Sequence, residues 1–150
     1  MRHMMNLFGT VLIVVLALGW TNSARAEDDE SKFHNKDGSM KMPENYKDAV
    51  AAIEHHTAAV DKAIKDGKLD TLHKHGEEIK MLANMLPKLA SKEGSGVAAA
   101  DVKEINLTSK KLAATYEPLD EAGDAGKKEE SLKVYNEIVA LVATLKKFVK

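Results

Sequence analysis

The spacing of apolar residues predicts four amphipathic helices between residue 43 and the C-terminus. Apolar positions recur every three or four residues, which places them on one face of an α-helix. The first stripe is Tyr46, Val50, Ile53, Thr57, Val60 and Ile64; the second Leu72, Gly76, Ile79, Ala83, Leu86 and Ala90; the third Val102, Ile105, Ser109, Leu112, Tyr116 and Leu119; the fourth Ser131, Tyr135, Ile138, Val142, Leu145 and Val149. No segment alternates with a period of two, so no strand is expected.

Short connections join the predicted helices. Pro43 suits the first turn of the first helix, and glycines mark the later breaks at Gly67, at 91–97 and at 123–126. Helices that follow one another through short turns pack most simply as antiparallel neighbours. The sequence therefore predicts an all-α domain over residues 43–150, folded as an up-down-up-down four-helix bundle.

The chain before the bundle has two parts. Arg2, an apolar run of about ten residues at 11–20, and small residues around a cleavage site at Ala26 together form the pattern of a secretory signal peptide. A membrane-spanning helix needs roughly 20 apolar residues. We therefore expect 1–26 to be cleaved, with no stable membrane insertion afterwards, rather than kept as an anchor; the protein would be periplasmic or secreted. Residues 27–42 are charged and poor in apolar side chains, which predicts a disordered arm.

Composition narrows the classes of function. The absence of cysteine excludes disulfides, thiolate metal sites and iron–sulfur clusters. Both arginines, Arg2 and Arg25, lie in the predicted signal, which leaves 20 lysines against 23 acidic residues. No nucleic acid is expected as a partner, because such binders carry basic surfaces. The chain also lacks a glycine-rich phosphate loop, a Gly-x-Ser-x-Gly motif and a His-Glu-x-x-His motif. We therefore expect no nucleotide cofactor and no enzymatic activity.

Histidines are the candidate chemical groups. Histidine is the commonest metal-ligating side chain, and four histidines lie on the first two predicted helices. His56 and His75 fall at the edges of the apolar stripes, whereas His55 and His73 fall farther toward solvent. An axial haem ligand must face the core, and only His56 and His75 come near that position, so no haem is expected. The alternative for both is an ordinary boundary residue whose nitrogens are hydrogen-bonded.

The predicted topology gathers ligands at one end of the bundle. The first and third turns of an up-down bundle share a pole, which brings Asp70, His73, His75 and Glu77 close to the acidic third turn, with His56 on the adjacent helix. Imidazole and carboxylate together suit copper(II), nickel(II) or zinc(II). We predict a divalent metal site from these five residues.

The arm carries a second candidate set of metal ligands. His34, Met40 and Met42 lie within nine positions of one another. Thioether and imidazole groups together can hold the soft ion copper(I). The alternative is a solvated tail without a ligand.

One stretch carries a family resemblance. The residues concerned are Gly67, Asp70, Leu72, His75 and Glu78, preceded by Asp48-Ala49-Val50. They resemble the small metal-binding proteins of bacterial periplasms, which are four-helix bundles built from histidine-rich hairpins. The resemblance implies binding of copper and other divalent metals, with His75, His73 and His56 keeping the matching chemistry. That family carries histidines along every helix, whereas the third and fourth helices here have none, which implies fewer ions and weaker binding.

Two functions therefore compete. The first is a small exported protein that binds or buffers copper, nickel or zinc. The second is an interaction or accessory module that binds a protein partner or its own copy without metal. Apolar residues flanking the stripes of the second and fourth helices would form its contact face: Leu82, Leu89, Val134, Leu141 and Phe148.

Overall fold

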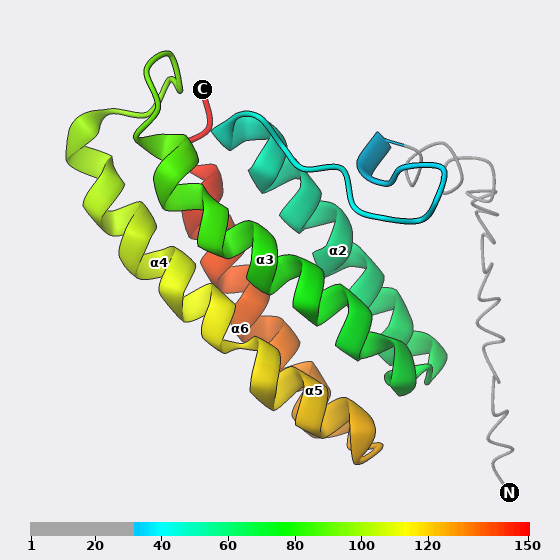
Figure 1. Ribbon diagram of the computed structural model, residues 1–150. Helices are drawn as coiled ribbons and strands as arrows, with labels where there is room; N and C mark the ends of the chain where they lie inside the picture. Colours follow the sequence, from blue (N-terminus) through cyan, green and yellow to red (C-terminus); the bar gives the residue numbers. More distant parts are fainter. Residues whose placement is uncertain (1–31) are drawn as a thin grey trace, which may run out of the picture.

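Four helical columns lie side by side in the computed structural model, which describes residues 32–150 (Figure 1). The helices are α2 (Tyr46–Asp66), α3 (Leu72–Ala90), α4 (Val102–Ala114), α5 (Tyr116–Asp124) and α6 (Lys128–Lys146), with 3-10 turns η1 (Leu69–Thr71) and η2 (Ala99–Asp101) before α3 and α4. Within residues 32–150 no strand occurs, although an isolated bridge pairs His34 with Met40. The predicted all-α class with four helices is confirmed for this part of the chain; the predicted signal lies outside the described residues.

The third column is made of two helices, because Pro118 has no N–H to donate to the carbonyl of Ala114. The chain breaks at Thr115, whose hydroxyl donates to the Leu112 carbonyl at 2.7 Å, and resumes as α5. At the far end of α5, a Cβ on Gly123 would come within 2.8 Å of the Leu69 carbonyl oxygen. Glycine thus lets α5 approach the η1–α3 corner closely.

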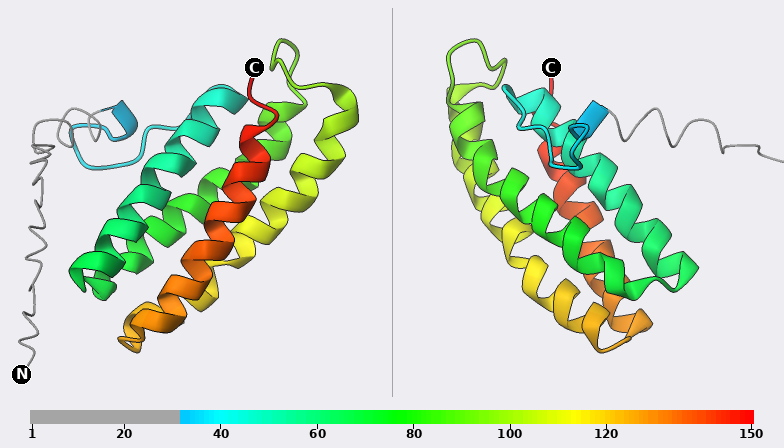
Figure 2. Two further views of the ribbon diagram at one scale, coloured as in Figure 1. Left: turned by 180° about the vertical axis from the view of Figure 1, so that it is seen from behind. Right: turned by 45° about the vertical axis from the view of Figure 1, so that its right-hand side comes forward.

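The connections between the helices lie at the two ends of the bundle. α3 contacts α2, α4 and α5, and α6 contacts α2, α4 and α5. Both views of Figure 2 show the α2–α3 and α5–α6 turns at one end of the bundle, and the α3–α4 loop with the C-terminus at the other. The first turns of α3 therefore face α5.

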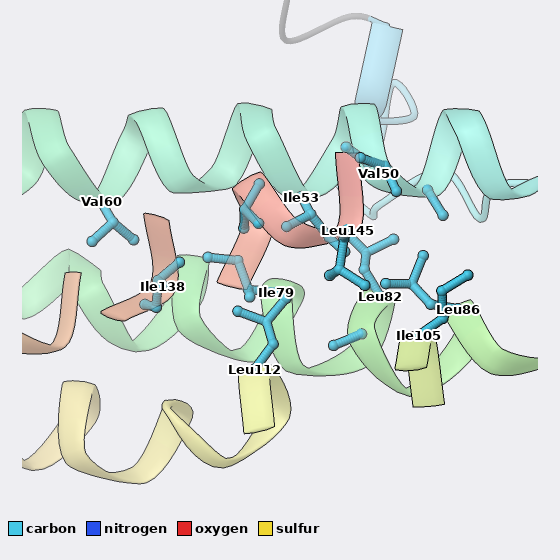
Figure 3. Close-up of a cluster of buried hydrophobic side chains, with 14 of the residues drawn as sticks. Val50, Ile53, Val60, Ile79, Leu82, Leu86, Ile105, Leu112, Ile138 and Leu145 are labelled. Carbon is cyan, nitrogen blue, oxygen red and sulfur yellow. The ribbon is translucent and has the colours of Figure 1, made fainter. Parts of the chain in front are cut away.

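The predicted stripes form one core (Figure 3). Every stripe residue of α2 and α3 is buried. Stripe residues at the margins are partly buried: Val102, Tyr116, Tyr135 and Val149. Tyr46 at the start of α2 donates its hydroxyl to the Leu145 carbonyl at 2.9 Å, which fastens α2 to the end of α6. Burying one large aliphatic side chain contributes about 1.5–3 kcal/mol, so this core is a major source of the bundle's stability.

The residues that flank the stripes also pack inward. Leu82 and Leu89 are buried, while Val134, Leu141 and Phe148 lie partly buried against the core. They do not form the open face that the sequence suggested. In the described part of the chain, the exposed large apolar side chains are Met42, Met81, Leu107, Leu132 and Val139.

Two helix starts differ from the predicted ones. α2 begins at Tyr46 rather than near Pro43, because Asn45 is its N-cap and its side-chain oxygen accepts the Asp48 N–H at 2.9 Å. Asp70 has the residue type of an N-cap and precedes the second stripe, which predicts a helix start directly after it, but it lies in η1 and α3 begins at Leu72. None of the described helices has both the length and the apolar character needed to cross a membrane.

Residues 32–44, here called the strap, lie beside α2 (Figure 1). The expected disordered arm is replaced, from residue 32 on, by a defined turn: the Asn35 N–H donates to the Ser39 carbonyl at 2.7 Å, and Gly38 takes a φ of +80°. Phe33 and Met40 pack partly buried against the core. The strap has few apolar groups of its own, but the helices provide an apolar surface for those two side chains, which composition alone does not reveal.

Candidate metal centre

Three separate elements bring histidine and glutamate side chains together under the strap. His34 of the strap, His56 of α2 and Glu78 of α3 each offer one ligand atom, and these atoms lie within 4.8 Å of one another. His34 Nε2 is 3.2 Å from Glu78 Oε1, and His56 Nδ1 is 3.0 Å from Glu78 Oε2. His75, one turn before Glu78 on α3, places its Nδ1 3.6 Å from the same Oε2. We call these four residues the His/Glu cluster.

The cluster is shielded from water. The His56 side chain is fully buried, and those of Glu78 and His34 are 11% and 12% exposed. The ring of His56 lies 5.5 Å from that of His34 and 5.9 Å from that of His75, measured between centroids. His56 was expected at the edge of its stripe; α3 and the strap cover that edge and bury it.

Several polar atoms of the cluster have no hydrogen bond. Both ring nitrogens of His56, Nδ1 of His75 and Oε2 of Glu78 are buried without a hydrogen-bond partner. Their short separations therefore lack the alignment of N–H···O bonds. His34 and Glu78 do share a hydrogen bond, at 3.2 Å. Leaving a buried polar group unpaired costs about 1–3 kcal/mol, so such a concentration of unpaired atoms is unusual in a folded protein.

The charge state of Glu78 suits a metal ligand. Burial acts to raise its pKa, but the surrounding His56, His75 and His34 outweigh burial and hold the pKa of Glu78 well below its ordinary value. Glu78 is therefore a carboxylate at neutral pH. It can accept hydrogen bonds or ligate a cation, and it needs no proton removed first.

Glu78 is missing from the ligand set predicted from the sequence. The signal that identifies it is its spacing from His75, because residues three apart on a helix share a face. The predicted set instead includes Glu77, which lies four residues after His73 and shares a face with it. Placing Glu78 next to His56 and His34 also requires the contacts between α2, α3 and the strap, which local spacing does not encode.

The other predicted ligands lie in a second group, at the turn end of α3. His73 Nδ1 is 2.8 Å from Asp120 Oδ1 of α5 and 3.1 Å from the Tyr116 hydroxyl, and its Nε2 is 4.0 Å from Glu77 Oε2. The hydrogen bond and charge of Asp120 raise the pKa of His73. His73 is more than half exposed, so the protein and water together satisfy it. Asp70 is exposed in η1 and has no described contact with the His/Glu cluster.

The methionine ligands predicted for the arm do not point to one site. His34 belongs to the His/Glu cluster, and Met40 pairs with it only through the backbone bridge while its side chain packs on the core. Met42 is exposed. The strap therefore contributes an imidazole to a site shared with α2 and α3.

Comparisons with known proteins leave the cluster to be interpreted from its own chemistry. No protein-family model matches the chain, and no curated protein or solved structure shows significant similarity to it. The resemblance to periplasmic metal-binding bundles stays a prediction.

Proposed function

We propose that this chain is an exported, non-enzymatic, up-down-up-down helical bundle that binds or buffers a divalent metal ion at the His/Glu cluster. One observation carries the proposal: ligand atoms of His34, His56 and Glu78 converge within 4.8 Å, and the His56 ring nitrogens and Glu78 Oε2 among them are buried without a hydrogen-bond partner. A cation among them would give each lone pair the partner it lacks. The proposal of export draws on the signal-peptide pattern of residues 1–26 alone.

The set of donor atoms narrows the choice of metal ion. Three imidazoles and one carboxylate suit zinc(II), copper(II) or nickel(II), whereas magnesium and calcium prefer oxygen ligands throughout. His75 would be the fourth ligand beside His34, His56 and Glu78. Four protein ligands close the coordination sphere of a tetrahedral ion and leave no position for substrate. This closure supports storage or delivery of the ion in preference to catalysis.

Calorimetric titration of the purified, untagged protein with zinc(II), copper(II) and nickel(II) tests the proposal. We expect one saturable site with submicromolar affinity for at least one of the three. His56→Leu removes a buried ligand at similar volume and is expected to abolish that site. His73→Leu, at an exposed position of α3 outside the His/Glu cluster, is the control and keeps it. Absence of saturable binding, or equal loss in both variants, would overturn the proposal.

The interaction-module alternative makes a different prediction. Leu132 and Val139 are seven residues apart on α6 and both exposed, which places them on one side of that helix. A protein that binds no metal but self-associates in sedimentation experiments, and that becomes monomeric in Leu132→Glu, would favour the alternative.

A further inference from the structure

We infer that the strap is a detachable part of the metal site: metal binding closes it onto α2 and α3, and metal loss releases it. The inference rests on the proposed function and adds its regulation. His34 is the one member of the His/Glu cluster that lies outside the helices. Its position therefore depends on whether the strap is docked.

The strap is held to the bundle by side chains. Its described backbone hydrogen bonds in residues 33–41 close within the strap itself, such as the bond from the Lys41 N–H to the Phe33 carbonyl at 2.7 Å. Contact with α2 comes from the Phe33 ring, stacked on His55 at 4.8 Å between centroids. Contact with α3 comes from the His34–Glu78 hydrogen bond. A segment attached in this way can open without breaking a helix.

Packing beneath the strap is incomplete. A cleft of about 310 Å³, open to solvent on one side, lies between the strap and the first turns of α2, and its walls include Phe33, Met42, Asp48 and Ala52. Close packing is what makes a docked segment rigid. The strap is thus attached by side chains, among them the His34 contact, the Phe33 stack and the partly buried Met40.

Coordination would draw the strap inward. The candidate ligand atoms of His34, His56 and Glu78 span up to 4.8 Å, whereas ligands around a tetrahedral zinc ion lie roughly 3.3 Å apart, given metal–ligand bonds of about 2.0–2.1 Å. The distances from Glu78 to His34 and to His56, 3.2 and 3.0 Å, already match this spacing, so the contraction falls on the remaining separations. Because His56 and Glu78 lie on packed helices, the strap that carries His34 would supply it. The ion would then replace the His34–Glu78 hydrogen bond with metal–ligand bonds, which attach the strap to the bundle more strongly.

The coupling is reciprocal. If metal favours the closed strap, the closed strap must favour metal by the same factor. Opening removes His34, uncovers the remaining ligands and weakens the site, which provides a route for handing the ion to a competing ligand. When the strap closes, it covers the ion and its buried ligand His56, which slows release of the ion.

Limited trypsin digestion with and without zinc(II) tests the inference, with cleavage after Lys36 and Lys41 followed by mass spectrometry. Cleavage of a transiently open segment tracks the population of the open state. We expect saturating zinc(II) to slow both cleavages by a factor within the roughly 5- to 150-fold range typical of coupled sites. His34→Ala should lose this protection while retaining weakened zinc binding through the helical ligands. His73→Ala, the control, should be protected like the wild type.

Calorimetry on the same samples separates the two proposals. Zinc binding with unchanged cleavage after Lys36 and Lys41 would overturn the strap inference and leave the metal site standing. Equal protection in the His34→Ala variant would also overturn it, because the strap would then close without its ligand. Absence of zinc binding would overturn both.

Discussion

His73 and His75 are two residues apart on α3, yet their surroundings are opposite. His73 is exposed and has a carboxylate and a phenol as partners. His75 points toward Glu78 and His56, where polar atoms are buried without hydrogen bonds. Both belong to the ligand set that the sequence predicts. The comparison shows that a histidine next to carboxylates indicates a metal only when the protein leaves those groups unsatisfied.

The two groups also differ in what they contribute to stability. An exposed ion pair such as His73–Asp120 contributes little in water. In the His/Glu cluster, by contrast, the ring nitrogens of His56, Nδ1 of His75 and Oε2 of Glu78 are buried without a hydrogen bond, and each such atom destabilises the metal-free fold. Proteins keep costly buried polar groups mainly where they serve a function. The unpaired atoms therefore point to His56, His75 and Glu78, and Glu78 in turn pairs with His34.

The largest expected effect separates adjacent glutamates. Glu78→Gln keeps the size of the side chain but removes the carboxylate, and we expect metal affinity to fall by at least about 100-fold, because even partners outside the coordination sphere are worth about 10–100-fold. Glu77→Gln, the matched control on the exposed side of α3, should bind as the wild type does. Calorimetry with zinc(II) measures both. A similar loss in the two variants would move the site to the His73 group.

A smaller effect, of opposite sign, concerns the metal-free protein. His56→Leu replaces two unpaired buried nitrogens with an apolar side chain of similar volume. We expect the free energy of unfolding without metal to rise by about 1 kcal/mol, while the stabilisation by metal, about 2.7 kcal/mol for wild type at 100 times the Kd, disappears. Urea unfolding with chelator and with metal checks both halves. If the free energy of unfolding with chelator instead falls by more than about 1 kcal/mol in the variant, His56 is well paired in the wild type, because losing a paired buried group costs roughly 1–3 kcal/mol.

The fold was more predictable than the site, for physical reasons. A helix stripe is a local pattern, and every stripe residue of α2 and α3 is buried as predicted. The site depends on contacts between elements. His34 and Glu78 are 44 residues apart and meet only because the strap folds back over α3. His34 and His56 were nevertheless among the predicted candidates, because the chemistry of a residue can be recognised without knowing its contacts. That they belong to one cluster could not be predicted, because it depends on those contacts.

The smallest expected effect concerns His73 and its dependence on pH. Asp120 raises the pKa of His73, so an NMR titration should place it above the ordinary value of about 6.5, and Asp120→Asn should return it toward that value. A histidine whose pKa is raised by folding stabilises the fold fully below the unfolded pKa, and this contribution is lost as pH rises through the folded pKa. Because His73 is exposed, added salt should weaken the effect. Zinc(II) should leave the His73 signals in place while shifting those of His34, His56 and His75. Zinc-induced shifts confined to His73 would reverse the assignment of the two groups, since the exposed pair would then be the ligand and the buried cluster a structural feature of the core.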